Sequence, residues 1–152
     1  MQNRIVWSLG AALIAALMMM PAQVSAQDAV AARTIWDGVY TEAQADRGKL
    51  AYKACTKCHG SRLNGAPDDP DRNATPPLAR SPFLRDWTGR NIQSLFAFTK
   101  MTMPQNNPGY LPDQDYVDII AYMLSMSDAP AGEEELPLDP DALTAITIEP
   151  KP

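Results

Sequence analysis

Cys55-Thr56-Lys57-Cys58-His59 is the stretch of sequence from which the interpretation of this chain starts. It holds the only two cysteines and the only histidine among the 152 residues. A disulfide between Cys55 and Cys58 would close a very short loop, and the stabilisation from such a closure grows with loop length. The two thiols are therefore expected to have another use.

C-x-x-C-H is the attachment pattern of haem c. Two thiols one helical turn apart can each add to a vinyl group on one haem edge, and the adjacent imidazole then lies beneath the iron. Two alternatives use the same residue types. A dithiol redox motif is expected in a βαβ context, and a zinc site needs about four ligands. The sequence shows no βαβ pattern and no further Cys or His. We predict one covalent haem c bound by Cys55, Cys58 and His59.

The first 26 residues have the anatomy of a secretory signal peptide. Arg4 supplies a positive charge, residues 5–20 are almost purely apolar, and Val24-Ser25-Ala26 offers small residues before a cleavage point. A retained membrane anchor is the alternative, but a bilayer span needs about 20 apolar residues and this run is about 16. We predict cleavage after about Ala26, a periplasmic protein, and no membrane span in the mature chain.

The acidic net charge of the chain bears on whether it binds nucleic acid. The chain has 13 basic and 18 acidic side chains, and loss of Arg4 with the signal peptide leaves 12 against 18. Phosphate binding relies on clustered Lys and Arg, so no nucleic-acid partner is expected.

Three helices are predicted, with loops between them. Thr41 and Gln44 have the spacing of a capping box, so a first helix is expected from Glu42 to about Ala54. Gly48 inside this helix costs about 1 kcal/mol relative to Ala, which a close approach by another helix would explain. Thr88 or Asn91 would cap a second helix that ends near residue 100, because apolar residues recur at helical spacing from residue 92 to residue 99.

The third helix is predicted to start at Pro112, since proline suits the first turn of a helix. Its apolar stripe runs from Tyr116 to Leu124. Residues 60–82 and 101–112 are rich in proline and glycine, which predicts loops, and a loop as long as the first suggests a bound group that organises it. The predicted organisation is a signal peptide (1–26), an N-terminal extension (27–40), a haem domain (41–127) and an acidic, proline-rich tail (128–152), wrapped on the surface or mobile.

The second axial ligand of the iron cannot be another histidine of this chain, because His59 is its only histidine. Methionine, lysine, water and an open site remain. Met103 is favoured over Met101, because Pro104 follows it and restricts the backbone that would present the thioether. Met101 is expected in the core or beside the haem, and Met123 and Met126 in the core.

These residues resemble the class I c-type cytochromes with His/Met iron. The resemblance rests on C-x-x-C-H after a first helix, a later Met-Pro, and a last helix that ends in Ala-Tyr-x-Leu. It covers roughly residues 39–127 and implies an all-α cytochrome c fold, with three to four helices around the haem, long loops and an extended tail. Residues 38–45, 83–87 and 130–137 are also similar to small exported cytochromes, some of which work with quinoprotein alcohol dehydrogenases.

The resemblance implies further roles. In Pro76-Pro77-Leu78, the Pro76 carbonyl would accept the Nδ1 proton of His59 and so orient its ring. Gly48 and Tyr52 would contact Tyr122 on the last helix. Trp87 and Arg90 would donate hydrogen bonds to a haem propionate, with ordinary packing and a solvated surface role as the alternatives. Related sequences often have Ser where Pro112 stands, so the usual hydroxyl cap is lost.

The predicted activity is electron transfer and not enzymatic catalysis, because His/Met ligation fills both axial positions. We expect a diffusible periplasmic carrier between a dehydrogenase and an oxidase or another cytochrome. A bound subunit of a multisubunit oxidoreductase and a haem sensor or enzyme with an open sixth site are the alternatives. Basic residues near the attachment turn are expected to steer acidic partners: Lys53, Lys57, Arg62 and Lys100.

Overall fold

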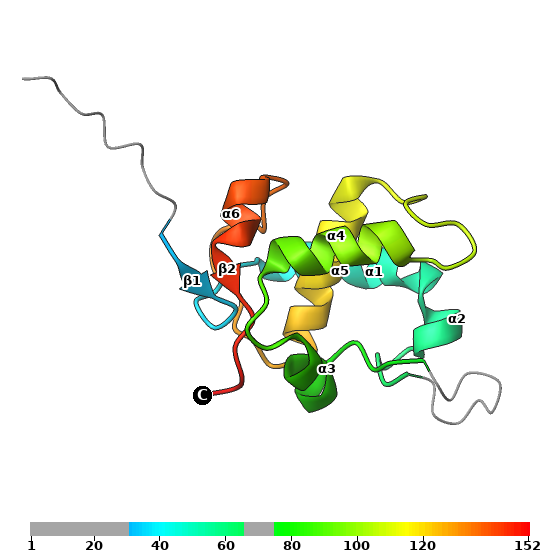
Figure 1. Ribbon diagram of the computed structural model, residues 1–152, viewed down its shortest axis with the longest axis horizontal. Coiled ribbons are helices and arrows are strands. Elements are labelled where there is room, and N and C mark those ends of the chain that lie inside the picture. The colour runs from blue at the N-terminus through cyan, green and yellow to red at the C-terminus, as the bar shows by residue number, and fades with distance from the viewer. Residues whose placement is uncertain (1–30, 66–74) are drawn as a thin grey trace, which may run out of the picture.

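Helices dominate the structure of this chain. The structure is a computed structural model that describes residues 31–65 and 75–152, so the predicted signal peptide lies outside the described residues. In chain order the elements in Figure 1 are β1 (Arg33–Thr34), α1 (Glu42–Ala51), the 3-10 turn η1 (Tyr52–Ala54), α2 (Thr56–His59), α3 (Arg80–Trp87), α4 (Ile92–Thr102), α5 (Asp113–Ser125), α6 (Pro140–Thr144) and β2 (Ile146–Thr147). The predicted all-α class is confirmed. None of the helices in the described ranges is long and apolar enough to cross a bilayer.

The crossing of α1 and α5 forms the centre of the fold. Gly48 is the closest point, because a Cβ atom there would overlap the backbone carbonyl of Asp118. One helical turn further on, the rings of Tyr52 and Tyr122 meet edge to face, with their centroids 5.6 Å apart. The predicted contact between these residues is confirmed, and it explains why α1 tolerates a glycine.

The helix starts follow the predicted capping residues, with one difference. The Thr41 hydroxyl accepts a 3.1 Å hydrogen bond from the Gln44 backbone N–H, and the Asn91 carbonyl Oδ1 accepts one of 2.8 Å from Ser94. Gln44 does not close the capping box, because its side-chain amide binds the backbone of Leu136 instead. Pro112 stands at the N-cap of α5 and supplies no side-chain bond.

Two sequence expectations about element limits need correction. The first helix ends at Ala51 and continues as the tighter turn η1, so it does not run unbroken to Ala54. The stretch predicted as loop to residue 82 already contains the start of α3 at Arg80. Pro82 lies in the first turn of α3, where proline is tolerated because the amide there has no helical acceptor.

The C-terminal tail (residues 128–152) packs against the domain over most of its length. Gln44 makes two hydrogen bonds to the backbone of Leu136, at 2.8 and 3.0 Å, and Tyr40 donates one of 2.6 Å to the Ala129 carbonyl. β2 pairs in parallel with β1, with Arg33 opposite Ile146. The tail also adds apolar side chains to the core: Leu136, Leu143, Ile146 and Ile148. Of the two predicted states of the tail, the structure has the wrapped one.

The burial of the methionine side chains tests where each was expected to lie. Met123 is buried in the core, as predicted, and Met126 packs against it half-buried. Met101 is 75% exposed, so it does not lie in the core, and the other expected place, beside the haem, stays a prediction. Ile92 and Leu95 form the buried stripe of α4, and Met101 falls on a different side of that helix.

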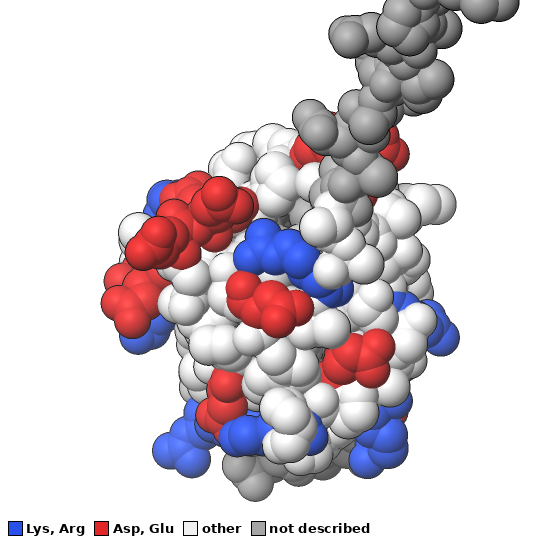
Figure 2. Space-filling model, turned by 90° about the vertical axis from the view of Figure 1, so that its left-hand side faces the viewer, with Lys and Arg blue, Asp and Glu red and all other residues white. Residues whose placement is uncertain are grey.

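Acidic and basic side chains are interspersed on the face that carries β1, β2 and α6. Figure 2 shows several groups of Asp and Glu on this face, with Lys and Arg between them. Part of the acidic charge comes from the tail, where Glu133, Glu134 and Glu135 are all exposed.

Candidate haem site

The C-x-x-C-H segment forms one tight turn. The Cys55 carbonyl accepts hydrogen bonds from the backbone N–H groups of Cys58 and His59, at 3.1 and 2.9 Å. This winds residues 56–59 into α2 and sets the two cysteines one turn apart. Neither cysteine is in a disulfide. Two thiols presented on one turn suit attachment to one edge of a planar group.

The environment of Cys55 does not suit a dithiol redox motif. Burial, followed by the nearby Cys58, raises the pKa of the Cys55 thiol to about 11. Reactive redox cysteines have lowered pKa values, because the thiolate is the nucleophile. In the part of the chain that the structure describes, no three His, Cys, Asp or Glu side chains gather where they could hold a metal ion, so the zinc alternative finds no support there.

His59 is buried and fixed in orientation. Its Nδ1 lies 3.0 Å from the Pro76 carbonyl oxygen, as the family resemblance implied. A carbonyl can only accept, so Nδ1 carries the proton and Nε2 is left with a free lone pair. Burial lowers the pKa of His59 more than the Pro76 carbonyl raises it, which favours the neutral ring. A neutral imidazole with a free Nε2 is the form that ligates iron.

Gly65 is part of the reason why Pro76 reaches His59. The Gly65 N–H donates to the His59 carbonyl at 3.0 Å, and a Cβ atom at Gly65 would overlap the carbonyl of Thr75. The Leu78 N–H donates to the Leu63 carbonyl at 2.8 Å and fixes the returning chain. Sequence reasoning named Gly65 only as part of a loop, because the contact joins segments that are far apart in the chain.

Met103 is the C-cap of α4, and hydrogen bonds hold its backbone on both sides. Its N–H donates to the Thr99 carbonyl at 2.8 Å, and its own carbonyl accepts from the Tyr116 hydroxyl at 2.8 Å and from Gly109 at 3.3 Å. The bond from Tyr116 was not predicted, since the sequence showed that residue only as part of an apolar stripe. The end of α4 and the short helix α2 both lie on the right-hand side of Figure 1.

Trp87 and Arg90 lie together, at the turn between α3 and α4. The guanidinium carbon of Arg90 is 5.1 Å from the centre of the Trp87 ring, and the ring of Phe98 meets the same indole edge to face at 5.6 Å. The Arg90 carbonyl accepts a hydrogen bond from Ile148, which ties this corner to the tail. Trp87 is half-buried and Arg90 is exposed, and neither side chain has a hydrogen bond to another described residue. Both donors are thus available for the predicted propionate.

The residues present fit a covalently bound haem. They supply two free thiols on one turn and a buried neutral imidazole whose Nε2 is uncommitted. Together, the helical fold and this turn define a haem c protein. The model of the family described as "Cytochrome c" matches residues 45–127, which is more than half of the chain. The chain belongs to the cytochrome c family, whose members carry covalent haem c and transfer electrons.

Comparison with curated proteins gives no significant match, and comparison with solved structures gives none either. The family match begins within α1 and ends just after α5, so it covers the attachment turn, Met103 and the helix crossing. The tail lies outside the matched residues.

Proposed function

We propose that this cytochrome is a periplasmic single-electron carrier with one haem c ligated by His59 and Met103. When bound, the haem supplies a one-electron couple at its iron. Cys55 and Cys58 hold it covalently, and the Pro76 carbonyl orients the His59 ring. With both axial positions filled, small ligands have no open site on the iron.

The hydrogen-bonded backbone of Met103 is the observation that supports this proposal most directly. A thioether is a weak ligand, so its backbone needs to be held in place. Met103 has backbone bonds to α4 on one side, and bonds from Tyr116 and Gly109 on the other. Met101, the other methionine near the end of α4, is largely exposed.

The location and the partners are also part of the proposal. The signal-like first 26 residues support export to the periplasm. The family resemblance suggests a periplasmic dehydrogenase as donor, with a quinoprotein alcohol dehydrogenase as one example. An oxidase or another cytochrome would be the acceptor.

A freely diffusing carrier is favoured over a bound subunit by the packing of the tail. A subunit could use the tail and the region of Trp36 as its attachment surface. In the structure the tail buries Leu136 and Ile148 in the protein's own core, and the Trp36 indole N–H donates to the Glu149 carbonyl at 3.2 Å. These surfaces are therefore already used within the chain.

The test is a spectrum of the oxidised and reduced protein, with carbon monoxide added to the reduced sample. We expect a weak Met-to-iron band in the near infrared in the oxidised state and no carbon monoxide shift in the reduced state. A clear carbon monoxide shift in the unmodified protein would contradict Met103 ligation and favour the sensor or enzyme alternative.

Two methionine variants make this test specific. Met103→Ala should abolish the near-infrared band, allow carbon monoxide to bind, and lower the reduction potential. Met101→Ala is the matched control and should retain the spectrum of the unmodified protein, because its side chain is 75% exposed. The opposite pattern would assign the ligand to Met101.

A further inference from the structure

The loop that follows Met103 does not hold that residue by packing of its own side chains. Residues 105–110 are all exposed, and Leu111 is the first residue after them that packs against the core. Inside the loop, the Asn107 N–H donates to the Pro104 carbonyl at 2.9 Å, which closes a local turn. The position of Met103 therefore depends on contacts from the two flanking helices, α4 and α5.

The helix α4 fixes only one side of the Met103 backbone. The Met103 N–H donates to the Thr99 carbonyl, but its φ of −123° and ψ of 146° are extended, so the chain leaves the helix at this residue. The Met103 carbonyl lies beyond the last turn and needs a donor from elsewhere. When the peptide planes on both sides of a Cα atom are held, the direction of its Cα–Cβ bond is set. The group that binds this carbonyl therefore decides where the thioether points.

Tyr116, in the first turns of α5, supplies that donor. Its hydroxyl donates to the Met103 carbonyl at 2.8 Å, whereas the Gly109 N–H reaches the same oxygen at 3.3 Å. Tyr116 is 1% exposed, and its ring meets that of Phe96 edge to face, with the centroids 6.5 Å apart. Because burial and this ring contact fix the tyrosine, its hydroxyl holds the carbonyl in one direction.

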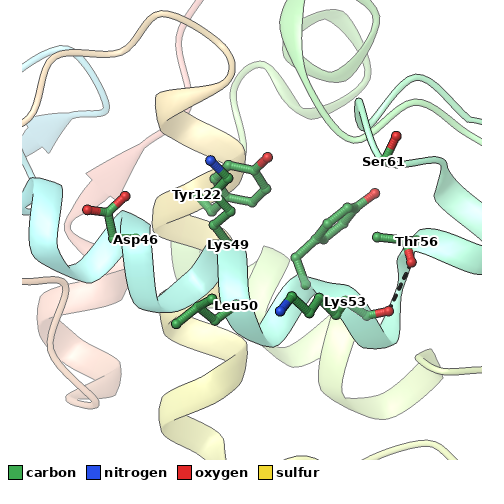
Figure 3. Close-up of a pocket in the computed structure, with 8 residues that line it drawn as sticks. Asp46, Lys49, Leu50, Lys53, Thr56, Ser61 and Tyr122 are labelled. Atoms are coloured by element: carbon green, nitrogen blue, oxygen red, sulfur yellow. Dashed lines mark hydrogen bonds between the residues drawn. The ribbon is translucent and has the colours of Figure 1, made fainter.

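The helix that carries Tyr116 also packs on the helix that leads to the haem-attachment turn. α5 and α1 approach most closely at Gly48, and α1 continues through η1 into α2. Figure 3 shows Tyr122 of α5 beside α1, and the 3.0 Å hydrogen bond from the Thr56 hydroxyl to the Lys53 carbonyl at the start of α2. One pair of packed helices thus supports both the attachment turn and the bond to the methionine backbone.

We propose that Tyr116 is a positioning residue for the axial ligand, whose hydroxyl holds the Met103 carbonyl so that the thioether stays on the iron. This inference rests on the proposed ligation by His59 and Met103 and adds the residue that maintains it. Without this bond the carbonyl would keep only the longer contact from Gly109. Met103 would then leave the iron more often, and small ligands would reach the sixth position in those moments.

A second contact joins the same two helix ends and serves as a comparison. The Lys100 ammonium group lies 2.7 Å from the Asp113 carboxylate, and the two side chains are 39% and 47% exposed. Exposed ion pairs contribute little, and this one does not touch the backbone of Met103. It is therefore expected to join α4 to α5 without setting the direction of the thioether.

The experiment measures imidazole binding to the full, haem-loaded protein in its oxidised state. Imidazole competes with Met103 for the iron, so its apparent affinity scales with the fraction of molecules whose sixth position is open. Tyr116→Phe keeps the buried ring and removes only the hydroxyl. It should raise the imidazole affinity about threefold to tenfold, the usual effect of one hydrogen bond, and weaken the near-infrared Met-to-iron band.

Two matched variants separate this effect from a general loosening of the fold. Tyr40 is 2% exposed and its hydroxyl donates to the Ala129 carbonyl at 2.6 Å, so Tyr40→Phe deletes an equivalent bond at the tail. It should change the imidazole affinity less than about twofold, because distant sites act independently. Lys100→Gln removes the exposed ion pair and should also change the affinity less than about twofold.

The Met103→Ala background shows whether Tyr116 acts through the methionine. In that variant the sixth position is open in every molecule, so imidazole binds far more tightly than to the unmodified protein. Adding Tyr116→Phe to Met103→Ala should leave the imidazole affinity unchanged, because the hydroxyl then has no ligand to hold in place. The two substitutions are thus expected to be strongly non-additive.

Three results would overturn the role of Tyr116. They are an unchanged imidazole affinity in Tyr116→Phe, an equal gain in either control variant, and the same gain with and without Met103. Each of them leaves the proposed ligation standing, because Met103→Ala would still raise the affinity. If Met103→Ala instead left the imidazole affinity unchanged, the proposed ligation itself would fail, and the role of Tyr116 would fail with it.

Discussion

The α1–α5 crossing and the C-terminal tail contribute to the same core, but they are encoded in different ways. The crossing is made by two regular helices: α5 has apolar residues at helical spacing, and α1 buries Gln44, Ala45 and Gly48 against it, with the glycine at the point of contact. The tail has few regular elements, and its buried residues are spread from Ala129 to Ile148. Its backbone is fixed by long-range bonds, such as those from Gln44.

This difference shows which parts of a fold can be predicted from local sequence patterns. A periodic stripe specifies both a helix and the face that it buries, whereas an irregular segment specifies its packing only through partners far away in sequence. We expect the crossing to be sensitive to added volume and the tail to be sensitive to lost volume.

The largest effect is expected for Gly48→Ala. The added methyl group would overlap the Asp118 carbonyl, which belongs to a helix backbone and cannot move aside without separating α1 from α5. Overpacking usually costs about 1–3 kcal/mol, and we expect about 4 kcal/mol or more here because the clash is with backbone. Denaturant unfolding of the haem-loaded protein, followed by circular dichroism, measures this free energy.

Gly89→Ala is the control for that substitution. Gly89 has a φ of +78° and no atom within 4 Å of a Cβ placed there, so only backbone strain is added, about 1–2 kcal/mol. Equal losses at the two glycines would show that the close helix approach is not what requires Gly48.

The next effect is expected for Leu136→Ala in the tail. Leu136 is 1% exposed, and deleting a buried leucine costs about 2–5 kcal/mol because a cavity remains. Leu138, two residues along the same segment, is 48% exposed, so Leu138→Ala should change the unfolding free energy by less than about 0.5 kcal/mol. The same unfolding experiment compares the two.

Equal and small effects of these two leucine variants would mean that the tail does not contribute to the core in solution. In that case the tail would again be a candidate attachment surface, and the bound-subunit alternative would gain support.

How far the sequence predicted the site depends on how local each contact is. The turn that holds Cys55, Cys58 and His59 lies within five consecutive residues, so a pattern identified it. The acceptor for His59 lies at Pro76, and only a family resemblance identified it. The hydrogen bond from Tyr116 to the Met103 carbonyl was not predicted, because a stripe of apolar residues does not show which group the tyrosine hydroxyl contacts.

The same distinction between local and long-range contacts applies to the fold. The starts of α4 and α5 lie close to the predicted caps, as Asn91 illustrates, but α4 ends at Thr102, inside the stretch that was predicted as a loop. Gln44 shows the opposite case, in which a residue with the spacing of a capping box is used for a contact 92 residues away. Local propensity could not distinguish these two uses, because in both the Gln44 side chain pairs with a backbone amide, and only the fold decides that this amide is the one of Leu136.

The smallest effect is expected for Glu135→Gln, which tests whether charge helps to hold the tail. Glu135 accepts hydrogen bonds from Arg47 at 2.7 and 2.9 Å, and these lower the pKa of its carboxyl group below the ordinary value of 4.5. A carboxylate with a lowered pKa in the folded state stabilises the fold above its ordinary pKa, and this stability is lost as the pH falls through the lowered value. Both partners are more than 40% exposed, so we expect a loss of only about 0.5 kcal/mol at neutral pH.

Unfolding as a function of pH measures this contribution, with Glu134→Gln as the matched control. The Glu134 carboxylate is 83% exposed and 3.9 Å from Arg33, so its removal should have no measurable effect. The Glu135→Gln variant and the unmodified protein should differ at neutral pH and converge in acid. A loss as large as that of Leu136→Ala would mean that the Arg47 ion pair, and not the buried leucine, attaches the tail. The tail would then detach in acid, and the packing at Gly48 would remain as a contact between α1 and α5 that involves no titratable side chain.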